Sequence, residues 1–168
     1  MTANILDGKR ILAVDDEADV LETLEDLLED YEGLVLDTAR DYESGYHLLR
    51  SWTYDAVILD IMGVRGFDLL SACVHLGFPT VMLTAHAVTE DALKKSIKLG
   101  AISFLPKENM ADLKEFVEGA VMKEGASMWK KVFDKLGAYL NMRFGPDWKE
   151  RDKFFKELEE SLMQKETL

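Results

Sequence analysis

Apolar runs and amphipathic segments alternate along the first 124 residues, and this alternation limits the folds open to the chain. Five short stretches, such as "DAVILDIM" at residues 55–62, are almost continuously apolar. A segment whose apolar residues recur at helical spacing follows each of them. Apolar strands separated by helices are typical of a parallel sheet that is covered on both faces. We therefore predict a five-stranded α/β unit.

The bounds of the predicted elements follow from this pattern. Strands are expected at residues 10–16, 34–39, 55–62, 80–86 and 101–107, and helices at 17–31, 42–51, 66–76, 89–99 and 109–124. Asp41 is a suitable N-cap for the second helix. Gly100 stands where the C-terminus of the fourth helix favours glycine. Asn109 and Asp112 resemble a capping pair for the fifth helix.

Polar side chains stand at the predicted carboxyl ends of four of these strands. Ligand sites in parallel α/β sheets form outside these ends, at a topological switch point. The residues concerned are Asp15, Asp16, Asp60, Thr84 and Lys107. Two adjacent carboxylates repel one another unless one takes up a proton. A divalent cation relieves this repulsion, and Mg²⁺ prefers oxygen ligands.

The composition changes near "KEGAS", and we predict a boundary between a unit at residues 1–124 and an extension at residues 125–168. The first part carries 11 basic and 24 acidic residues, whereas the second carries 9 and 8. Helical spacing of apolar residues on both sides of "RFGPDWKE" predicts a helical hairpin, with Asp147 and Glu150 as a capping pair. The apolar face of each predicted helix has to be shielded from water by another surface. These faces pack back on the first unit, form a homodimer or dock an effector; the sequence leaves these three alternatives open.

Charge and composition exclude several classes of function. The formal net charge of −12 argues against nonspecific binding to nucleic acid or to anionic membranes. The single cysteine, Cys73, allows neither an internal disulfide framework nor a multi-cysteine zinc site. We find no signal peptide in "MTANILDGKR" and no apolar run long enough to span a bilayer. The expectation is a cytoplasmic protein.

The chain from about Lys9 to Lys123 resembles the receiver domain of bacterial two-component response regulators. The matching pieces are "AVDDEADV", "AVILDIM", "VMLTAH" and "SFLPKE", in the family's order and near its spacing. The resemblance implies a flavodoxin-like (βα)5 parallel sheet in the strand order 2-1-3-4-5. It also implies a phosphorylation-activated signalling module of a phosphorelay, with a sensor histidine kinase or a phosphotransfer protein as partner.

The resemblance assigns roles to particular residues. Asp60 is the phosphoacceptor that forms an aspartyl phosphate, and Mg²⁺ is held by Asp15, Asp16, Asp60 and the main-chain carbonyl of Met62. Lys107 and the hydroxyl of Thr84 contact the phosphoryl group.

The remaining implied residues concern the switch and its timing. Ala85 leaves room for the phosphoryl group, and Phe104 changes rotamer as Thr84 moves. Met62 and His86 gate water and so tune hydrolysis. No enzymatic activity is expected beyond self-phosphorylation from a donor and self-dephosphorylation.

The sequence also departs from the family pattern. After Asp60 the family has a proline four residues on and a glycine eight on, but "DIMGVRGFDLL" has no proline and places Gly66 six on. Glu108, instead of a proline, follows Lys107. These changes alter the loop over the site and, with it, the expected lifetime of the phosphoryl group.

Three other readings compete with a phosphorylated module that lacks a DNA-binding output domain and signals through protein contacts. The first is a receiver-fold scaffold that acts without phosphorylation. The second is a Mg²⁺-dependent phosphatase, but Met62 stands where its second acidic residue is expected. The third is a nucleotide-binding enzyme, and the glycine-rich phosphate-binding motifs of that class are absent from the sequence.

Overall fold

The computed structural model describes residues 4–85, 89–124 and 126–166. The strands are β1 Arg10–Val14, β2 Val35–Ala39, β3 Ala56–Asp60, β4 Thr80–Thr84 and β5 Ser103–Pro106. The helices are α1 Ala18–Leu28, α2 Tyr42–Ser51, α3 Gly66–Leu76, α4 Glu90–Leu99, η1 Lys107–Asp112, α5 Leu113–Val121, α6 Ala126–Phe144, α7 Trp148–Arg151 and α8 Lys153–Glu166. No helix within these ranges is long and apolar enough to cross a membrane.

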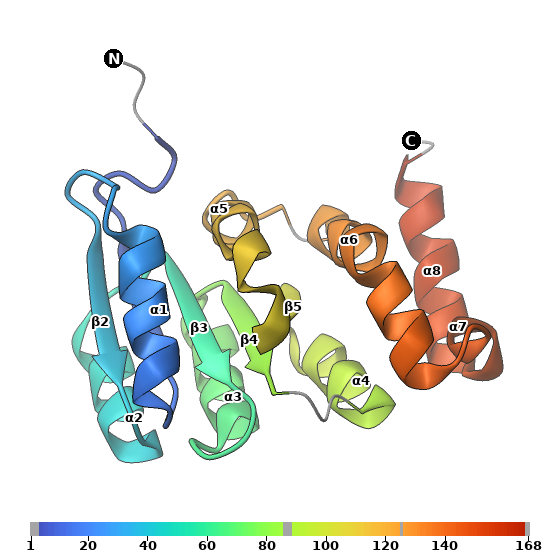
Figure 1. Cartoon of the computed structure of the whole chain (residues 1–168), viewed down its shortest axis with the longest axis horizontal. Coiled ribbons are helices and arrows are strands. Elements are labelled where there is room, and N and C mark those ends of the chain that lie inside the picture. The colour runs from blue at the N-terminus through green and yellow to red at the C-terminus, as the bar shows by residue number, and fades with distance from the viewer. Residues whose placement is uncertain (1–3, 86–88, 125, 167–168) are drawn as a thin grey trace.

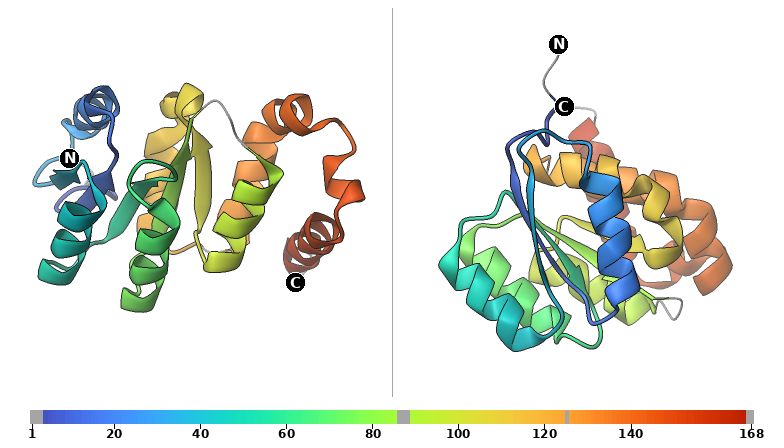
Figure 2. Two further views of the ribbon diagram at one scale, coloured as in Figure 1. Left: turned by 90° about the horizontal axis from the view of Figure 1, so that it is seen from below. Right: turned by 60° about the vertical axis from the view of Figure 1, so that its left-hand side comes forward.

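All five strands form one parallel sheet in the order β2-β1-β3-β4-β5. Helices α1 and α5 cover one face, and α2, α3 and α4 cover the other (Figures 1 and 2). The predicted flavodoxin-like (βα)5 fold and its strand order are therefore confirmed. The change of winding direction lies between β1 and β3, whose carboxyl ends are adjacent.

Burial on both faces of the sheet explains why the central strands are almost continuously apolar. Every residue of β3, β4 and β5 is buried, whereas β2, at the edge of the sheet, leaves Val35 43% exposed. Two predicted caps are confirmed. The Asp41 carboxylate accepts a hydrogen bond from the Ser44 amide at 2.7 Å, and Gly100 ends α4 with a φ of 102°. These caps begin and end helices at the positions that the sequence indicates.

The segment after β5 differs from the prediction. Lys107–Asp112 forms a 3₁₀ helix, and α5 begins only at Leu113. The N-cap position of α5 is Asp112, whose side chain makes no capping hydrogen bond, and Asn109 lies inside the 3₁₀ segment, so the predicted capping pair of Asn109 and Asp112 is wrong. The tighter turn keeps Lys107 at the sheet edge while it returns the chain to the fully buried Leu113.

We call residues 126–166, which hold α6, α7 and α8, the tail. The one-turn helix α7 stands between the two predicted arms, and Asp147 accepts a hydrogen bond from Arg151 instead of capping α7. Trp148 lies at the centre of an aromatic cluster with Phe133, Phe144 and Phe155.

The tail packs beyond β5, at the end of the sheet opposite β2 (Figure 1). Among the three alternatives, packing on the first unit is the one that the structure contains. The buried residues of both parts form one continuous cluster, so the division at residues 1–124 and 125–168 stays a prediction.

Candidate functional site

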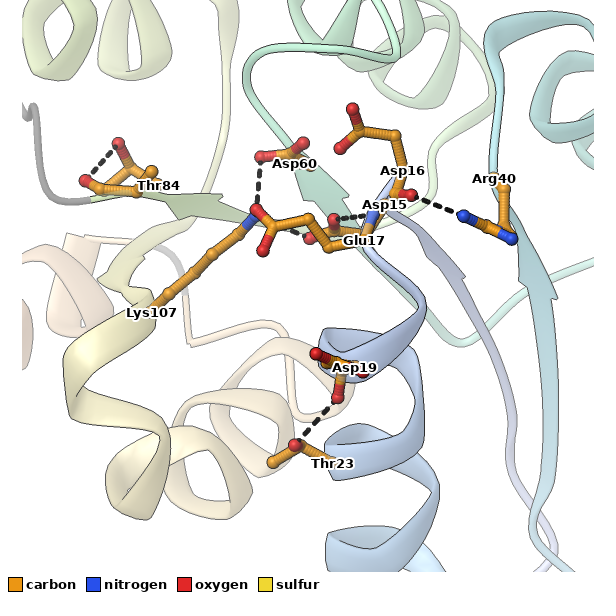
Figure 3. A network of polar contacts seen from close by, with 10 residues as sticks. Asp15, Asp16, Glu17, Asp19, Thr23, Arg40, Asp60, Thr84 and Lys107 are labelled. Carbon is orange, nitrogen blue, oxygen red and sulfur yellow. Dashed lines mark hydrogen bonds and ion pairs between the residues drawn. The ribbon is translucent and has the colours of Figure 1, made fainter.

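Three carboxylates converge at the carboxyl ends of β1 and β3. Asp15 and Asp16 follow β1 directly, and Asp60 is the last residue of β3. One oxygen from each lies within 4.8 Å of the others. Asp15 and Asp60 are 1% and 4% exposed, whereas Asp16 faces solvent. Figure 3 shows the three side chains around one small space at the sheet edge.

The Lys107 ammonium lies among these acids. Its Nζ is 2.9 Å from Asp15 Oδ2, 3.2 Å from Asp60 Oδ1 and 3.0 Å from Glu17 Oε1. Burial alone would lower the pKa of Lys107, but the three carboxylates outweigh it and raise that pKa above its usual value. Lys107 is therefore a permanent cation at this edge.

Burial also changes the acids themselves. It raises the pKa of Asp60 to about 7, and the nearby charge of Asp15 adds to this effect against the opposing attraction of Lys107. The pKa of Asp15 is raised too, mainly by burial, although its carboxylate accepts a hydrogen bond from the Glu17 amide at 2.9 Å. One cation, Lys107, does not fully compensate the two buried acids.

These residues fit a small hard cation. The three side-chain donors are all carboxylate oxygens, and Mg²⁺ prefers oxygen ligands. Asp15 Oδ2 is buried and has an ion pair but no partner in hydrogen-bond geometry. Burial first, and then the charge of Asp15, raises the pKa of Asp60, and a bound divalent ion would favour its carboxylate form.

The loop after Asp60 is unusually close to the site. A Cβ on Gly66 would lie 2.1 Å from the carbonyl oxygen of Asp60, and a Cβ on Gly63 would lie 2.5 Å from Asp16 Oδ2. The Gly66 amide also donates a hydrogen bond to the Ile61 carbonyl at 3.1 Å. Val64, between the two glycines, is 1% exposed. The shortened loop is thus compact because glycine occupies its two tightest positions.

The remaining predicted site residues occupy the same edge or its surroundings. Thr84 ends β4 and is 6% exposed, and its hydroxyl donates a long hydrogen bond of 3.4 Å to the Ala85 carbonyl. Ala85 faces solvent. Phe104 is fully buried in β5, and Met62 is 76% exposed in the loop after Asp60. His86 lies outside the described residues.

Two residues of this site were not predicted. Glu17 shares Lys107 with the buried acids, and Gly63 lets the backbone approach Asp16. The sequence could have indicated Glu17, because this residue directly follows the acidic pair Asp15 and Asp16. It indicated Gly63 only weakly, since single glycines are common in loops and do not by themselves mark a functional site.

Comparison with known proteins agrees with this geometry. Residues 11–118 match the family model of the response regulator receiver domain. The transcriptional regulatory protein CusR of Escherichia coli (strain K12) is 36% identical over 102 residues, which cover 58% of this chain and 44% of that protein. A protein-glutamate methylesterase/protein-glutamine glutaminase 2 of Nitratidesulfovibrio vulgaris is 36% identical over 104 residues, covering 58% and 28%.

Solved structures agree as well. A response regulator receiver domain from Clostridium thermocellum matches with a TM-score of 0.60 and 26% identity, over 69% of this chain and 96% of that one. The chain therefore belongs to the response regulator receiver domain family. It spans less than half the length of the two curated relatives described above. Receiver domains interact with histidine kinases or phosphotransfer proteins and bind Mg²⁺ at an acidic cluster of this kind.

Proposed function

We propose that this protein is a phosphorylation-operated signalling module in which Asp60 accepts a phosphoryl group from the phosphohistidine of a partner kinase or phosphotransfer protein. The observation that carries the proposal is the position of Asp60. Its carboxylate lies 3.2 Å from a lysine ammonium and within 4.8 Å of two further carboxylates, at the switch point of the sheet.

The transfer step is a displacement at phosphorus. A carboxylate oxygen of Asp60 attacks the phosphorus atom as the P–N bond to the donor histidine breaks, and the electron pair stays on the imidazole nitrogen, which takes up a proton. The product is an aspartyl phosphate. Such transfer needs positioning and charge neutralisation more than covalent help from the protein.

The residues around Asp60 supply both requirements. Asp15, Asp16, Asp60 and the carbonyl of Met62 would hold Mg²⁺, which neutralises the phosphoryl oxygens when it is bound. Lys107 offers its ammonium to one of these oxygens once it leaves Asp60, and Thr84 offers its hydroxyl to another. We further propose that Met62 and His86 control the access of water to the aspartyl phosphate. Ala85, whose side chain is small, would leave room for the phosphoryl group.

The output is proposed to run through protein contacts. The tail has 8 acidic charges beside its 9 basic ones, and so offers no concentrated basic face for DNA. Homodimerisation and an effector protein are both open routes for the signal. No catalytic role is proposed beyond the formation and loss of the aspartyl phosphate, although relatives of the receiver part, such as the methylesterase of Nitratidesulfovibrio vulgaris, carry enzyme names.

The test is the mass of the intact protein after incubation with Mg²⁺ and a small acyl phosphate. We expect a gain of one phosphoryl group that requires Mg²⁺ and is absent from Asp60→Ala. Asp68→Ala, which removes an exposed carboxylate from α3, is the matched control and keeps the gain.

A specific observation favours a second candidate, a scaffold that has the receiver fold but is not phosphorylated. The loop over Asp60 brings Gly66 against the Asp60 carbonyl and Gly63 against the Asp16 carboxylate, and it departs from the family's pattern in having no proline and an earlier glycine. No mass gain together with no Mg²⁺ binding would support the scaffold and overturn the phosphorylation proposal.

A further inference from the structure

Two open hollows lie next to one another where β4 and β5 begin, at the end of the sheet opposite the Asp60 site. The strand arrows in Figure 1 point away from this end. One hollow has a volume of about 300 Å³, and its lining includes Leu49, Arg50, Trp52, Leu76 and Phe78. The other has a volume of about 280 Å³, and its lining includes Val74, Phe78, Pro79, Ile102 and Lys123. Phe78 lines both, so the two hollows share one aromatic wall.

One polar cluster holds the aromatic walls of the first hollow from behind. The Arg10 guanidinium lies 3.8 Å from the centroid of the Trp52 ring, and its Nε donates a hydrogen bond of 2.9 Å to Asp37. The hydroxyl of the buried Tyr54 donates a hydrogen bond of 2.7 Å to the same carboxylate. The Tyr54 ring in turn meets the Phe78 ring edge-on, with 6.0 Å between their centroids. Both walls are therefore in place before a ligand arrives, which lowers the entropic cost of binding.

Exposed apolar side chains gather around these hollows. Trp52, Val74 and Leu76 are 51%, 43% and 44% exposed, and each of them lines one of the two. Single exposed apolar residues are ordinary, but a contiguous group with hollows between them is typical of a surface that binds another protein. Side chains one helical turn apart, with about 5–6 Å between their Cβ atoms, can enter two such neighbouring hollows.

The charge at the hollows is opposite in sign to that of the whole chain, whose formal net charge is −12. Each lining contains one charged residue, which is Arg50 in the first hollow and Lys123 in the second, and neither lining contains an acid. Within the part of the chain that the structure describes, neither cation has a carboxylate partner; the Arg50 guanidinium lies 5.8 Å from the centroid of the Tyr46 ring. A partner that carries carboxylates beside apolar side chains is therefore complementary to this surface.

The backbone at Lys123 gives an independent observation. Its φ is 55°, in the left-handed region, just past the end of α5. The amides of Lys123 and Glu124 donate hydrogen bonds of 3.0 and 3.2 Å to carbonyls of that helix. Glycine is the usual residue at this position, because a side chain is strained there. The chain holds a lysine in spite of the strain, and such strained residues gather at functional sites.

We propose that the two hollows bind an acidic amphipathic helix of a partner protein, with one apolar side chain in each hollow and carboxylates at Arg50 and Lys123. The hollows and their aromatic walls supply most of the affinity, and the two cations set the orientation of the helix. The surface lies a full strand length from Asp60. It therefore binds its partner whether or not Asp60 carries a phosphoryl group, and the inference does not depend on the proposed function.

The first test uses two labelled helical peptides with the full chain, in the absence of Mg²⁺ and phosphodonor. One peptide has two leucines one helical turn apart with glutamates beside them, and the other has lysines in place of the glutamates. We expect fluorescence anisotropy to show saturable binding of the glutamate peptide and about tenfold weaker binding of the lysine peptide, the range of two exposed charge pairs. Equal binding of the two peptides, or no binding of either, would overturn the inference.

Tryptophan fluorescence locates the bound peptide. Trp52 is half exposed in the first hollow, whereas Trp129 and Trp148 are buried, so quenching by acrylamide reports mainly on Trp52. We expect the glutamate peptide to reduce this quenching, in the unaltered protein and equally in Asp60→Ala. Binding that leaves the quenching unchanged would place the peptide elsewhere and contradict the assignment.

Lys123→Gly separates binding from folding. It removes the ammonium and also relieves the backbone strain, so we expect the urea unfolding midpoint to hold or rise while the affinity for the glutamate peptide falls about two- to fivefold, the range of one exposed ion pair. Lys156→Ala, which removes an exposed lysine from α8, is the matched control and leaves the affinity unchanged. A folded Lys123→Gly variant that binds as tightly as the unaltered protein would refute the role of this lysine.

Sedimentation velocity distinguishes a partner protein from a second copy of this chain. We expect the unaltered protein and Arg50→Glu to sediment alike, since the surface is meant for another protein. A dimer of the unaltered protein that dissociates in Arg50→Glu would place a second copy on the hollows and overturn the assignment to a partner protein.

Discussion

Gly66 lies directly against the backbone of Asp60: a Cβ at position 66 would be 2.1 Å from the Asp60 carbonyl oxygen. Only glycine fits there without a shift of the loop. The short loop between β3 and α3 therefore requires glycine at position 66.

Gly66→Ala is expected to destabilise the protein by about 2 kcal/mol or more, because the clash involves backbone atoms that have nowhere to move. Urea unfolding followed by circular dichroism measures this effect. Gly137→Ala is the matched control, since nothing lies within 4 Å of a Cβ at that position of α6. It should stabilise the helix slightly, by about 0.5–1 kcal/mol. Equal unfolding midpoints for the two variants would refute the steric argument.

The pKa of Asp60 predicts how stability depends on pH without Mg²⁺. Between the ordinary value of 3.8 and the native value of about 7, the native protein holds a proton on Asp60 that the unfolded chain has lost. The native state then binds more protons, so this group makes the free energy of unfolding fall as pH rises toward 7. Urea unfolding between about pH 5 and pH 8 measures the slope. In Asp60→Asn this contribution disappears, and the same slope in both proteins would show that Asp60 is not buried as described.

Lys107→Met tests the compensation of charge at the site. The variant leaves the buried Asp15 and Asp60 without their cation, so we expect a loss of about 1–3 kcal/mol in the free energy of unfolding without Mg²⁺. Addition of Mg²⁺ should stabilise the variant more than the unaltered protein. Thermal unfolding with and without Mg²⁺ gives both quantities. Lys114→Met, on α5, serves as control, and a similar Mg²⁺ response in both variants would count against the assigned charge balance.

The contact of Gly119 with Met128 predicts a paired effect. Gly119→Ala should destabilise the tail by about 1–3 kcal/mol, because its methyl group needs the space of the Met128 sulfur. Met128→Ala provides that space, so the double variant should lose less than the sum of the two single ones. Protease resistance of the tail and the fluorescence of the buried Trp129 and Trp148 follow the change. Additive losses would mean that the two side chains do not compete for space.

The sequence predicted which polar residues lie together at the sheet edge better than it predicted the contacts around them. Asp15, Asp16, Asp60, Thr84 and Lys107 could be placed together because parallel strands direct their carboxyl ends to one edge. Their proximity is then a consequence of topology and needs no knowledge of individual contacts. The roles of Phe104, Ala85, Met62 and His86 came from family resemblance alone, and they stay predictions.

Contacts between distant segments were not predictable in this way. Tyr139 and Glu108 are 31 residues apart, and no local pattern distinguishes this tyrosine from others on an amphipathic helix. The helical spacing in the tail indicated apolar faces but not their partner. The 3₁₀ turn at Lys107–Asp112 was missed because Asn109 and Asp112 have the spacing of a capping pair, whereas tertiary packing of Leu113 decides where α5 begins.

The place of α6 beside β5 has a consequence for how separate molecules meet. Within the described part of the chain, strand β5 pairs with β4 alone, so its outer side is a sheet edge, and α6 lies next to it (Figure 2). Uncovered edges are templates for pairing with strands of other chains. Helix α6 therefore also protects the sheet against edge-to-edge aggregation. A chain cut after residue 124 would present β5 to its neighbours and lose solubility as its concentration rises.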